Sequence, residues 1–210
     1  MPAHSKLALG VVILGAGASR RMGRPKLLLP WGETSVIGHL LAQWRTLGAG
    51  QTCLVCRPDD KPLAAELRRL KFPSRQCIVN SEPERGMFSS IVCAARWKGW
   101  KPWLTAWAIA LGDQPHLSMA TLRALVACHR KHPQAICQPV FEGHRRHPVI
   151  LPRDVFFGLQ HSNARTLKEF LQQTAAPLVE CPIMDAGLSC DLDSPSDYER
   201  LLTKARQRQI

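Results

Sequence analysis

Between residues 14 and 26 the chain carries glycines and cations at a spacing that suits the binding of a phosphorylated ligand. The stretch reads L-G-A-G-A-S-R-R-M-G-R-P-K and follows a short apolar run. Glycines let the main chain approach phosphate oxygens, which its N–H groups can bind. Arginine and lysine side chains neutralise negative charge that develops during phosphoryl chemistry. The stretch therefore predicts a polyphosphate site, against the simpler interpretation of a tight turn with solvated arginines.

Other interpretations of this stretch fit its residues less well. The dinucleotide fingerprint G-x-G-x-x-G is started by Gly15 and Gly17, but Arg20 stands where its third glycine belongs. Gly23 and Pro25 also interrupt the helix that should begin there. A Walker loop needs G-K-[ST], which this stretch lacks. A secretory signal would place its arginines before the apolar run, whereas here they follow it.

Carboxylates at two later places could hold a divalent cation on such a ligand. Asp113 follows the apolar segment A-I-A-L-G, where burial of a charged group requires a partner. Asp191 and Asp193 alternate in D-L-D-S-P-S-D-Y, so they could share one face of an extended segment. Mg²⁺ is a hard cation that takes oxygen ligands of this kind. The simpler interpretation is that these residues cap a following turn or helix.

The elements that must position these residues alternate between strands and helices. The apolar pattern predicts strands at 8–14, 51–56, 75–79, 104–111, 135–139, 147–151 and 178–181, and helices at 34–47, 61–70, 86–97, 118–131, 164–172 and 195–205. This order predicts an α/β fold with a mostly parallel sheet. Ligands of such sheets bind beyond the carboxyl ends of the strands, where Gly15 and Asp113 should lie. We expect a single domain over residues 1–210, with a nucleotide-binding part at about 8–115 and an acceptor-facing part at about 116–210.

Composition and charge limit the remaining functions. The net charge is +12, but the basic residues are scattered and mostly not interleaved with aromatic ones, which disfavours nucleic acid as the main ligand. No later apolar run approaches the roughly 18 residues of a membrane span. Six cysteines lie in or beside apolar runs: Cys53, Cys77, Cys93, Cys128, Cys137 and Cys181. Cys53 and Cys56 form C-x-x-C within a predicted strand, where they would point to opposite faces rather than share a zinc ion. We therefore expect reduced thiols in a cytoplasmic protein.

The motifs together resemble those of the molybdenum cofactor nucleotidyltransferases, most closely their cytidylyltransferase branch. The similar segments are L-x-A-G-x-S-R-R-M-G-x-P-K-x-L-L-P-W-G, then G-D-Q-P, G-x-x-x-H-P-V-I-L and D-L-D-S-P-S-D-Y. They run from about residue 11 to residue 201. The resemblance implies a Rossmann-like three-layer sandwich of the nucleotidyltransferase type. It also implies transfer of a nucleotidyl group from a triphosphate to a phosphorylated acceptor, with release of pyrophosphate and with Mg²⁺ as cofactor.

The resemblance also assigns expected roles to individual residues. Arg21 and Lys26 would meet the triphosphate and act in catalysis together with Asp113. Asp113 and Asp193 would hold the metal ion. The nucleotide would be bound by Leu14, Gly15, Ala16, Gly17, Ser89 and Ser90, and the acceptor by His147 and Asp191.

Residues 15–17 bear on the choice of base. Relatives that use GTP tend to carry two adjacent glycines here, and those that use CTP tend to carry alanines before one glycine. Ala16 therefore favours CTP, although Gly15 stands where alanine is more usual and Arg146 where glycine often precedes the histidine. The expected acceptor is molybdopterin or molybdenum cofactor, with a molybdoenzyme or its chaperone as a further partner. Open alternatives are GTP as donor, a sugar or polyol phosphate as acceptor, and a non-catalytic chaperone that carries the cofactor.

Overall fold

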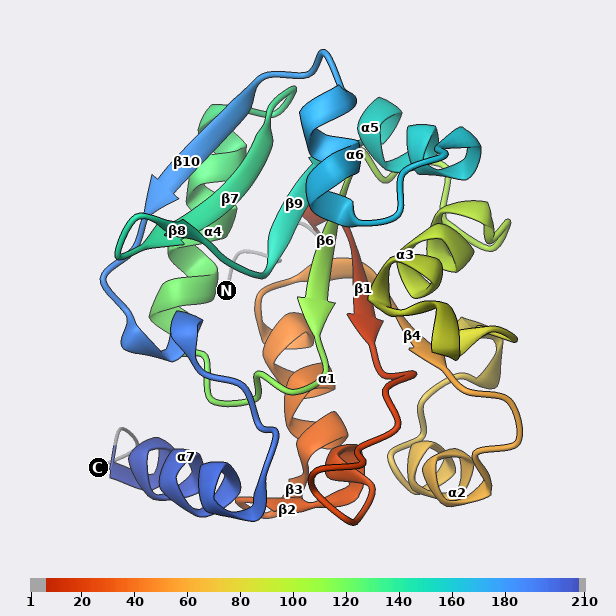
Figure 1. The fold of residues 1–210 in the computed structure, drawn as a ribbon, viewed down its shortest axis with the longest axis vertical. Helices are drawn as coiled ribbons and strands as arrows, with labels where there is room; N and C mark the ends of the chain where they lie inside the picture. The colour runs from red at the N-terminus through yellow and green to blue at the C-terminus, as the bar shows by residue number, and fades with distance from the viewer. Residues whose placement is uncertain (1–6, 208–210) are drawn as a thin grey trace, which may run out of the picture.

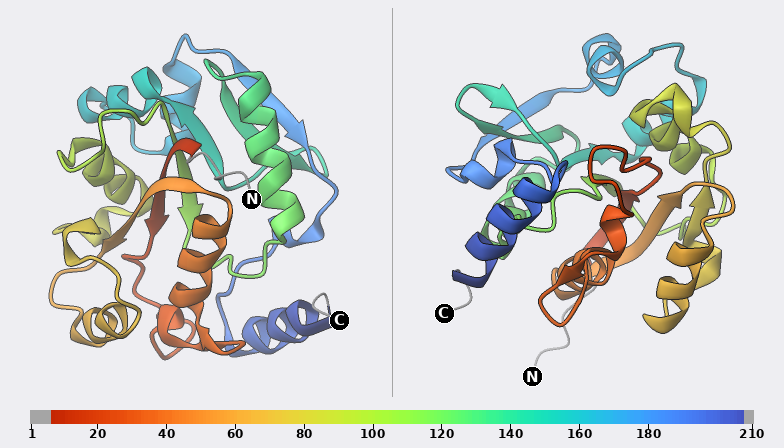
Figure 2. Two further views of the ribbon diagram at one scale, coloured as in Figure 1. Left: turned by 180° about the vertical axis from the view of Figure 1, so that it is seen from behind. Right: turned by 60° about the horizontal axis from the view of Figure 1, so that its bottom comes forward.

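The computed structural model describes residues 7–207, which form a mixed sheet of eight strands with helices on both faces (Figures 1 and 2). The strands are β1 (Leu7–Leu14), β4 (Ala49–Cys56), β5 (Cys77–Val79), β6 (Ala106–Leu111), β7 (Ile136–Phe141), β8 (His144–Arg145), β9 (Val149–Pro152) and β10 (Leu178–Pro182). They lie in the order β10-β7-β9-β6-β1-β4-β5, with β8 paired to β7. Strand β1 is thus central, between β4 and β6, and parallel to both. The predicted α/β fold with a mostly parallel sheet is confirmed.

The helices divide between two cores, one on each face of the sheet. The helices are α1 (Val36–Thr46), α2 (Lys61–Arg69), α3 (Met87–Arg96), α4 (Met119–Lys131), α5 (Arg153–Gly158), α6 (Leu167–Gln173) and α7 (Pro195–Gln207). Side chains of α1, α2, α4 and α7 pack in one core with Val11 and Ile13 of β1. Those of α3, α5 and α6 pack in the other core with Val12. The expected three layers follow from this alternation along a strand buried on both faces.

Capping side chains fix where helices α1 and α4 begin. Ser118 Oγ accepts a hydrogen bond from the Thr121 N–H at 3.0 Å at the start of α4. Helix α1 begins two residues later than predicted, because Ser35 is its cap and accepts from the Gly38 N–H at 3.1 Å. The residues before it pair as the short hairpin strands β2 (Pro30–Trp31) and β3 (Thr34–Ser35). Five short 3₁₀ helices complete the described chain: Lys26–Leu28, Ser74–Gln76, Pro83–Arg85, Leu159–His161 and Ala186–Ser189.

The cysteines agree with the sequence prediction in one respect and differ in another. Cys53 belongs to the core on one face of the sheet and Cys56 to the core on the other, as their spacing in a strand predicts. Cys128 of α4, however, forms a disulfide with Cys181 of β10. The expectation of reduced thiols throughout is therefore wrong for this pair. The two residues are 53 positions apart, and only the folded chain brings them together.

Within residues 7–207, the structure has no helix with both the length and the apolar character needed to cross a membrane.

Gly10 in β1 provides a test of the packing around the central strand. A Cβ atom at this position would lie 2.6 Å from ring atoms of Trp107, which is fully buried and stacks on Phe156 with ring centroids 4.6 Å apart. Gly10→Ala should therefore lower the free energy of unfolding by about 1–3 kcal/mol through overpacking. Urea denaturation measures the change. Gly17→Ala is the matched control, because no atom lies within 4 Å of its added Cβ; equal stabilities of the two variants would contradict the prediction.

Candidate active site

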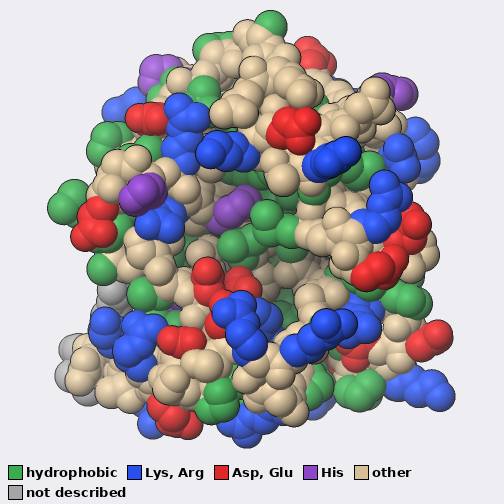
Figure 3. Space-filling view, viewed as in Figure 1, with side chains coloured by type: hydrophobic (Ala, Val, Ile, Leu, Met, Phe, Trp, Pro, Cys, Tyr) green, Lys and Arg blue, Asp and Glu red, His purple; other side chains and the backbone are tan. Residues whose placement is uncertain are grey.

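The carboxyl ends of β1 and β6 border a cleft with a volume of about 700 Å³. Figure 3 shows a hollow on this face of the molecule with Lys and Arg side chains around it. The cationic residues that line the cleft are Arg20, Arg24, Lys26 and Arg57. Of the residues that the sequence predicts for the site, the lining includes Leu14, Gly15, Ala16, Gly17, Lys26, Ser90 and Asp113. The order of strands and helices predicts ligand binding beyond the carboxyl ends of the strands, and the cleft lies there.

The glycine-rich loop that leaves β1 offers a row of backbone donors. Among the hydrogen bonds of residues 7–207, none uses the N–H groups of residues 16–21. The loop turns at Ser19, which has a φ of 51°, and its carbonyl accepts from the N–H groups of Met22 and Gly23 at 3.1 and 3.2 Å. Consecutive N–H groups without internal partners can bind an anion. This loop therefore has the properties of a phosphate cradle.

Close packing explains two glycines at the floor of the cleft. A Cβ atom on Gly15 would lie 2.8 Å from Leu54 Cδ1 and 2.9 Å from Leu27 Cδ1. A Cβ atom on Gly112 would lie 2.7 Å from the carbonyl oxygen of Leu14. Leu27 sits in the 3₁₀ turn that begins at Lys26, so this packing also fixes where the lysine lies. An alanine at position 15 would therefore require Leu54 and Leu27 to shift, which gives a packing reason for the glycine found there.

Four of the predicted site residues converge in one network of ion pairs. Lys26 Nζ lies 2.7 Å from Asp113 Oδ2 and 3.4 Å from Asp193 Oδ1, and it donates to the carbonyl of Leu192 at 3.4 Å. Arg21 donates to Asp193 Oδ2 at 2.7 Å. The side chains of Lys26, Asp113 and Asp193 are only 15%, 23% and 29% exposed, so water weakens these charges less than on an open surface. The backbone N–H of Leu192 donates to the carbonyl of Asp113 at 2.9 Å and holds the two segments together.

The carboxylates of this network fit a hard divalent cation. Lys26 occupies Oδ2 of Asp113, but Oδ1 of the same carboxylate is buried and has no hydrogen-bond partner within the described residues. A buried carboxylate oxygen without a partner is costly, and a cation would satisfy it. Asp193 offers a second carboxylate beside it, and oxygen donors of this type suit Mg²⁺ or Mn²⁺.

Asp191 and His147, expected at the acceptor side, are not among the residues that line this cleft. Asp191 accepts a hydrogen bond from the Gln114 side chain at 3.0 Å. Partial burial, followed by the charge of Asp113, raises the pKa of Asp191. The ring of His147 lies 3.4 Å from the carbonyl of Ile109, and burial lowers the pKa of His147 although the charge of Asp113 opposes that shift. Both residues therefore lie close enough to Asp113 for its charge to act on them.

Ser89 and Ser90 occupy different environments at the start of α3. Ser90 is buried and lines the cleft, whereas Ser89 donates to the carbonyl oxygens of Glu82 and Gly86 and so ties its own loop. Both hydroxyls accept from the side chain of Asn80, at 2.8 and 2.9 Å. Asn80 is only 1% exposed and positions this wall of the cleft. Sequence reasoning missed Asn80, although a polar residue directly after a predicted strand was a usable signal.

Helix α7 holds the Asp193 segment against the N-terminal loop. The hydroxyl of Tyr198 donates to the carbonyl of Pro30 at 2.7 Å, and the guanidinium of Arg24 lies 5.8 Å from the centre of the Tyr198 ring. Figures 1 and 2 show α7 beside the β2–β3 hairpin. These contacts join residues about 170 positions apart, so the local sequence does not predict them.

Comparisons with known proteins agree with this architecture. The family model described as a MobA-like NTP transferase domain matches residues 11–178. A bifunctional protein GlmU from Clavibacter sepedonicus is 34% identical over 128 residues, which are 59% of this chain but only 25% of that protein. Nicotine blue oxidoreductase from Paenarthrobacter nicotinovorans is 27% identical over 203 residues, covering 91% of this chain and 95% of that one.

Solved structures with a similar fold match nearly the whole chain. The crystal structure of Rv0371c from Mycobacterium tuberculosis H37Rv superposes with a TM-score of 0.73 at 28% identity, over 95% of this chain and 99% of that one. A second structure of Rv0371c, in complex with manganese, has a TM-score of 0.69 at 26% identity and covers 93% of this chain and 98% of that one.

Proposed function

This chain belongs to the family of MobA-like NTP transferase domains and is a nucleotidyltransferase, and from that premise we propose that it transfers CMP from CTP to a molybdopterin-type acceptor. A phosphate oxygen of the acceptor would attack the α-phosphorus of CTP. The bond between that phosphorus and the oxygen bridging to the β-phosphate would break, and pyrophosphate would leave. The observation that best supports this reaction is the convergence of Lys26, Asp113 and Asp193 beside a loop with available N–H groups.

The chain's own residues would act by positioning and by neutralising charge. The acceptor phosphate is already an anion, so no covalent enzyme intermediate is needed. The N–H groups of residues 18–21 would bind phosphate oxygens. Lys26 and Arg21 would neutralise the charge that builds up on the leaving pyrophosphate. Residues 14–17 and Ser90 would hold the nucleoside end of CTP, consistent with their place in the lining of the cleft.

Asp113 and Asp193 are the residues that would hold a divalent cation, proposed as Mg²⁺, and the manganese complex of Rv0371c supports a metal in a related protein. When bound, such a cation supplies Lewis-acid polarisation of a phosphoryl oxygen. The two carboxylates would also orient Lys26 until a triphosphate enters.

The choice of CTP and of the acceptor rests on fewer residues. Ala16 is 7% exposed at the floor of the cleft and favours CTP through the resemblance to the cytidylyltransferases. His147 and Asp191 are proposed to face the acceptor. The charge of Asp113 acts on the pKa of both residues, which is consistent with a position near the cleft. We further propose that the protein acts in the cytoplasm, where such an acceptor would be passed on to a molybdoenzyme or its chaperone.

The decisive experiment is a competition between triphosphates. The protein is incubated with Mg²⁺ and an equimolar mixture of CTP, GTP, ATP and UTP. The acceptor is molybdopterin or molybdenum cofactor in one reaction and a sugar or polyol phosphate in a parallel one, and the products are identified by mass spectrometry. We expect a cytidine dinucleotide of the cofactor and a rate for CTP at least roughly 10-fold above the others. A guanine dinucleotide would contradict the choice of base, and turnover of a sugar or polyol phosphate alone would contradict the acceptor. Tight binding of the cofactor without pyrophosphate release from any triphosphate would favour a chaperone.

A further inference from the structure

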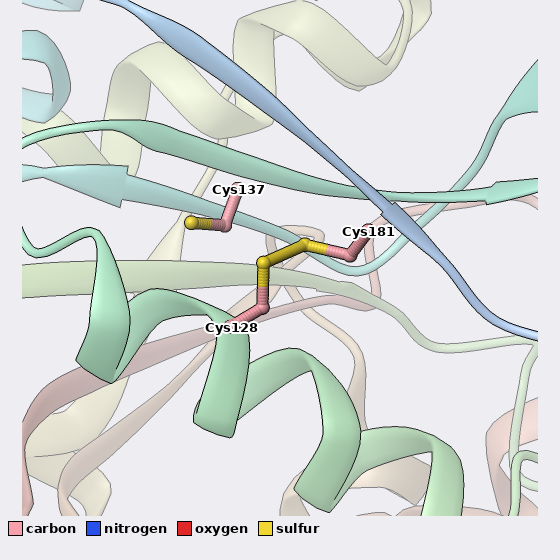
Figure 4. Close-up of side chains that lie close together, drawn as sticks. All are labelled: Cys128, Cys137 and Cys181. Carbon is pink, nitrogen blue, oxygen red and sulfur yellow. A yellow bond between two sulfur atoms is a disulfide. The ribbon is translucent and has the colours of Figure 1, made fainter.

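Three cysteine side chains meet on the far side of the sheet from α3, in a part of the molecule that the proposed reaction does not use. Cys128 comes from α4, Cys137 from β7 and Cys181 from β10 (Figure 4). Their sulfur atoms all lie within 4.8 Å of one another. Cys128 and Cys181 are joined in a disulfide, and Cys137 is a free thiol beside them. Cys137 and Cys181 are 0% and 5% exposed, whereas Cys128 is only half-buried.

We propose that, when the disulfide is reduced, Cys128, Cys137 and Cys181 form a site for one Zn²⁺ ion. Zn²⁺ binds thiolate sulfur at about 2.3 Å, which places the sulfurs of one tetrahedral site about 3.8 Å apart. Three sulfurs within 4.8 Å of one another need only small side-chain rotations to reach that arrangement. A set made of sulfur alone selects soft or borderline metals and excludes Mg²⁺ and Mn²⁺. This site is therefore separate in chemistry from the carboxylates of the cleft.

The elements that carry the three sulfurs give the site a rigid frame. Strands β7 and β10 are hydrogen-bonded in parallel, with Cys137 opposite Val179 and Cys181 opposite Pro139. Helix α4 packs on β7 and brings Cys128 over the same face. Cys128 is the most exposed of the three residues, so a metal ion would enter from its side.

The conversion between the two forms balances as follows. A dithiol reductant breaks the S–S bond between Cys128 and Cys181, each of which gains a hydrogen, and the reductant becomes a disulfide. Zn²⁺ then forms three Zn–S bonds and three thiol protons pass to the solvent. The disulfide form cannot offer three thiolates, so metal binding reports the redox state of the protein.

Zinc binding by the reduced protein tests this proposal without any nucleotide, so its outcome is independent of the proposed reaction. The full chain is reduced with a phosphine, freed of metal and titrated with Zn²⁺ against a chromophoric chelator. We expect one tightly bound Zn²⁺ per chain, and binding weaker by about 100-fold in Cys137→Ala. Cys53→Ala is the matched control, because Cys53 is also a fully buried free thiol but lies in the other core.

Two further measurements separate this site from the cleft. Asp113→Asn should keep its Zn²⁺, and Co²⁺ in place of Zn²⁺ should show thiolate-to-metal charge-transfer absorption that Cys137→Ala loses. Circular dichroism checks each variant; if Cys137→Ala is unfolded, Cys128→Ala carries the same expectation at a half-buried position. Equal zinc binding by the wild type and the folded cysteine variant, or no zinc held by the reduced wild type, would overturn the proposal and leave three neighbouring core cysteines.

Discussion

Replacing Asp113 with asparagine should reduce the rate of pyrophosphate release on the order of 10³-fold while the protein stays folded. Asparagine keeps the shape of the side chain but removes the charge that faces Lys26 Nζ at 2.7 Å. It also removes the carboxylate whose Oδ1 is buried without a protein partner, so the strongest candidate oxygen for a divalent cation is lost. Single-turnover measurement of pyrophosphate with CTP and the acceptor gives the rate.

Two controls make the Asp113 result interpretable. Asp154→Asn removes the same charge from an exposed position in the first turn of α5, far from the cleft lining, and should leave the rate unchanged. Urea denaturation should show Asp113→Asn unfolding cooperatively, as the wild type does. A rate within a few-fold of the wild type would exclude Asp113 from the reaction.

Replacing Lys26 with methionine should change two properties in opposite directions. Turnover should fall on the order of 10²-fold, because the triphosphate loses a cation beside its leaving group. Affinity for Mn²⁺ without nucleotide should rise roughly 10-fold, because the ammonium group no longer competes for Asp113 and Asp193. Electron paramagnetic resonance of free Mn²⁺ measures the second effect independently of activity.

The same variant tests a coupling between metal and nucleotide. In the wild type, a triphosphate that draws Lys26 away from the carboxylates should strengthen Mn²⁺ binding, and Mn²⁺ should strengthen CTP binding by the same factor. Lys26→Met should lose the part of this coupling that comes from displacing Lys26, while the part due to direct contact between the metal ion and the phosphates should remain. Lys61→Met is the control, because Lys61 is an exposed residue at the start of α2 and does not line the cleft. Unchanged Mn²⁺ affinity in Lys26→Met would show that its ion pairs do not compete with metal.

The sequence was most informative where a single local property determines the structure. Strands β1, β4 and β6 are buried on both faces and therefore appear as short continuous apolar runs. Helices α2 and α4 carry capping residues at their starts, and their predicted bounds differ from the observed ones by one residue. The short helix α5 was missed because its six residues follow Pro152 directly and do not complete an amphipathic repeat.

The candidate site was predictable in its members but not in their connections. Recognisable motifs contain Lys26, Asp113 and Asp193. The ion pairs between these residues, however, join positions up to 167 residues apart. The position of Asn80 after a predicted strand marks it as a candidate, but its hydrogen bonds to Ser89 and Ser90 are visible only in the folded chain. The antiparallel pairing of β9 with β6 and the disulfide between Cys128 and Cys181 likewise depend on how distant elements meet. Such contacts depend on the topology of the whole fold, and no local stretch of sequence specifies that topology.

The contacts of α7 with the first loop also determine when the protein can become active during its synthesis. A chain emerging from the ribosome can pair β1 with β4 and β6 and begin to bury its core long before α7 has been synthesised. At that stage Lys26 and Arg21 lack their hydrogen bonds to Asp193, and the carbonyl of Pro30 lacks its hydrogen bond from the hydroxyl of Tyr198. The proposed catalytic network is therefore complete only once Asp193 and Tyr198 have packed against the first loop, so a chain that ends before these residues would have the triphosphate loop but not the full set of proposed catalytic residues.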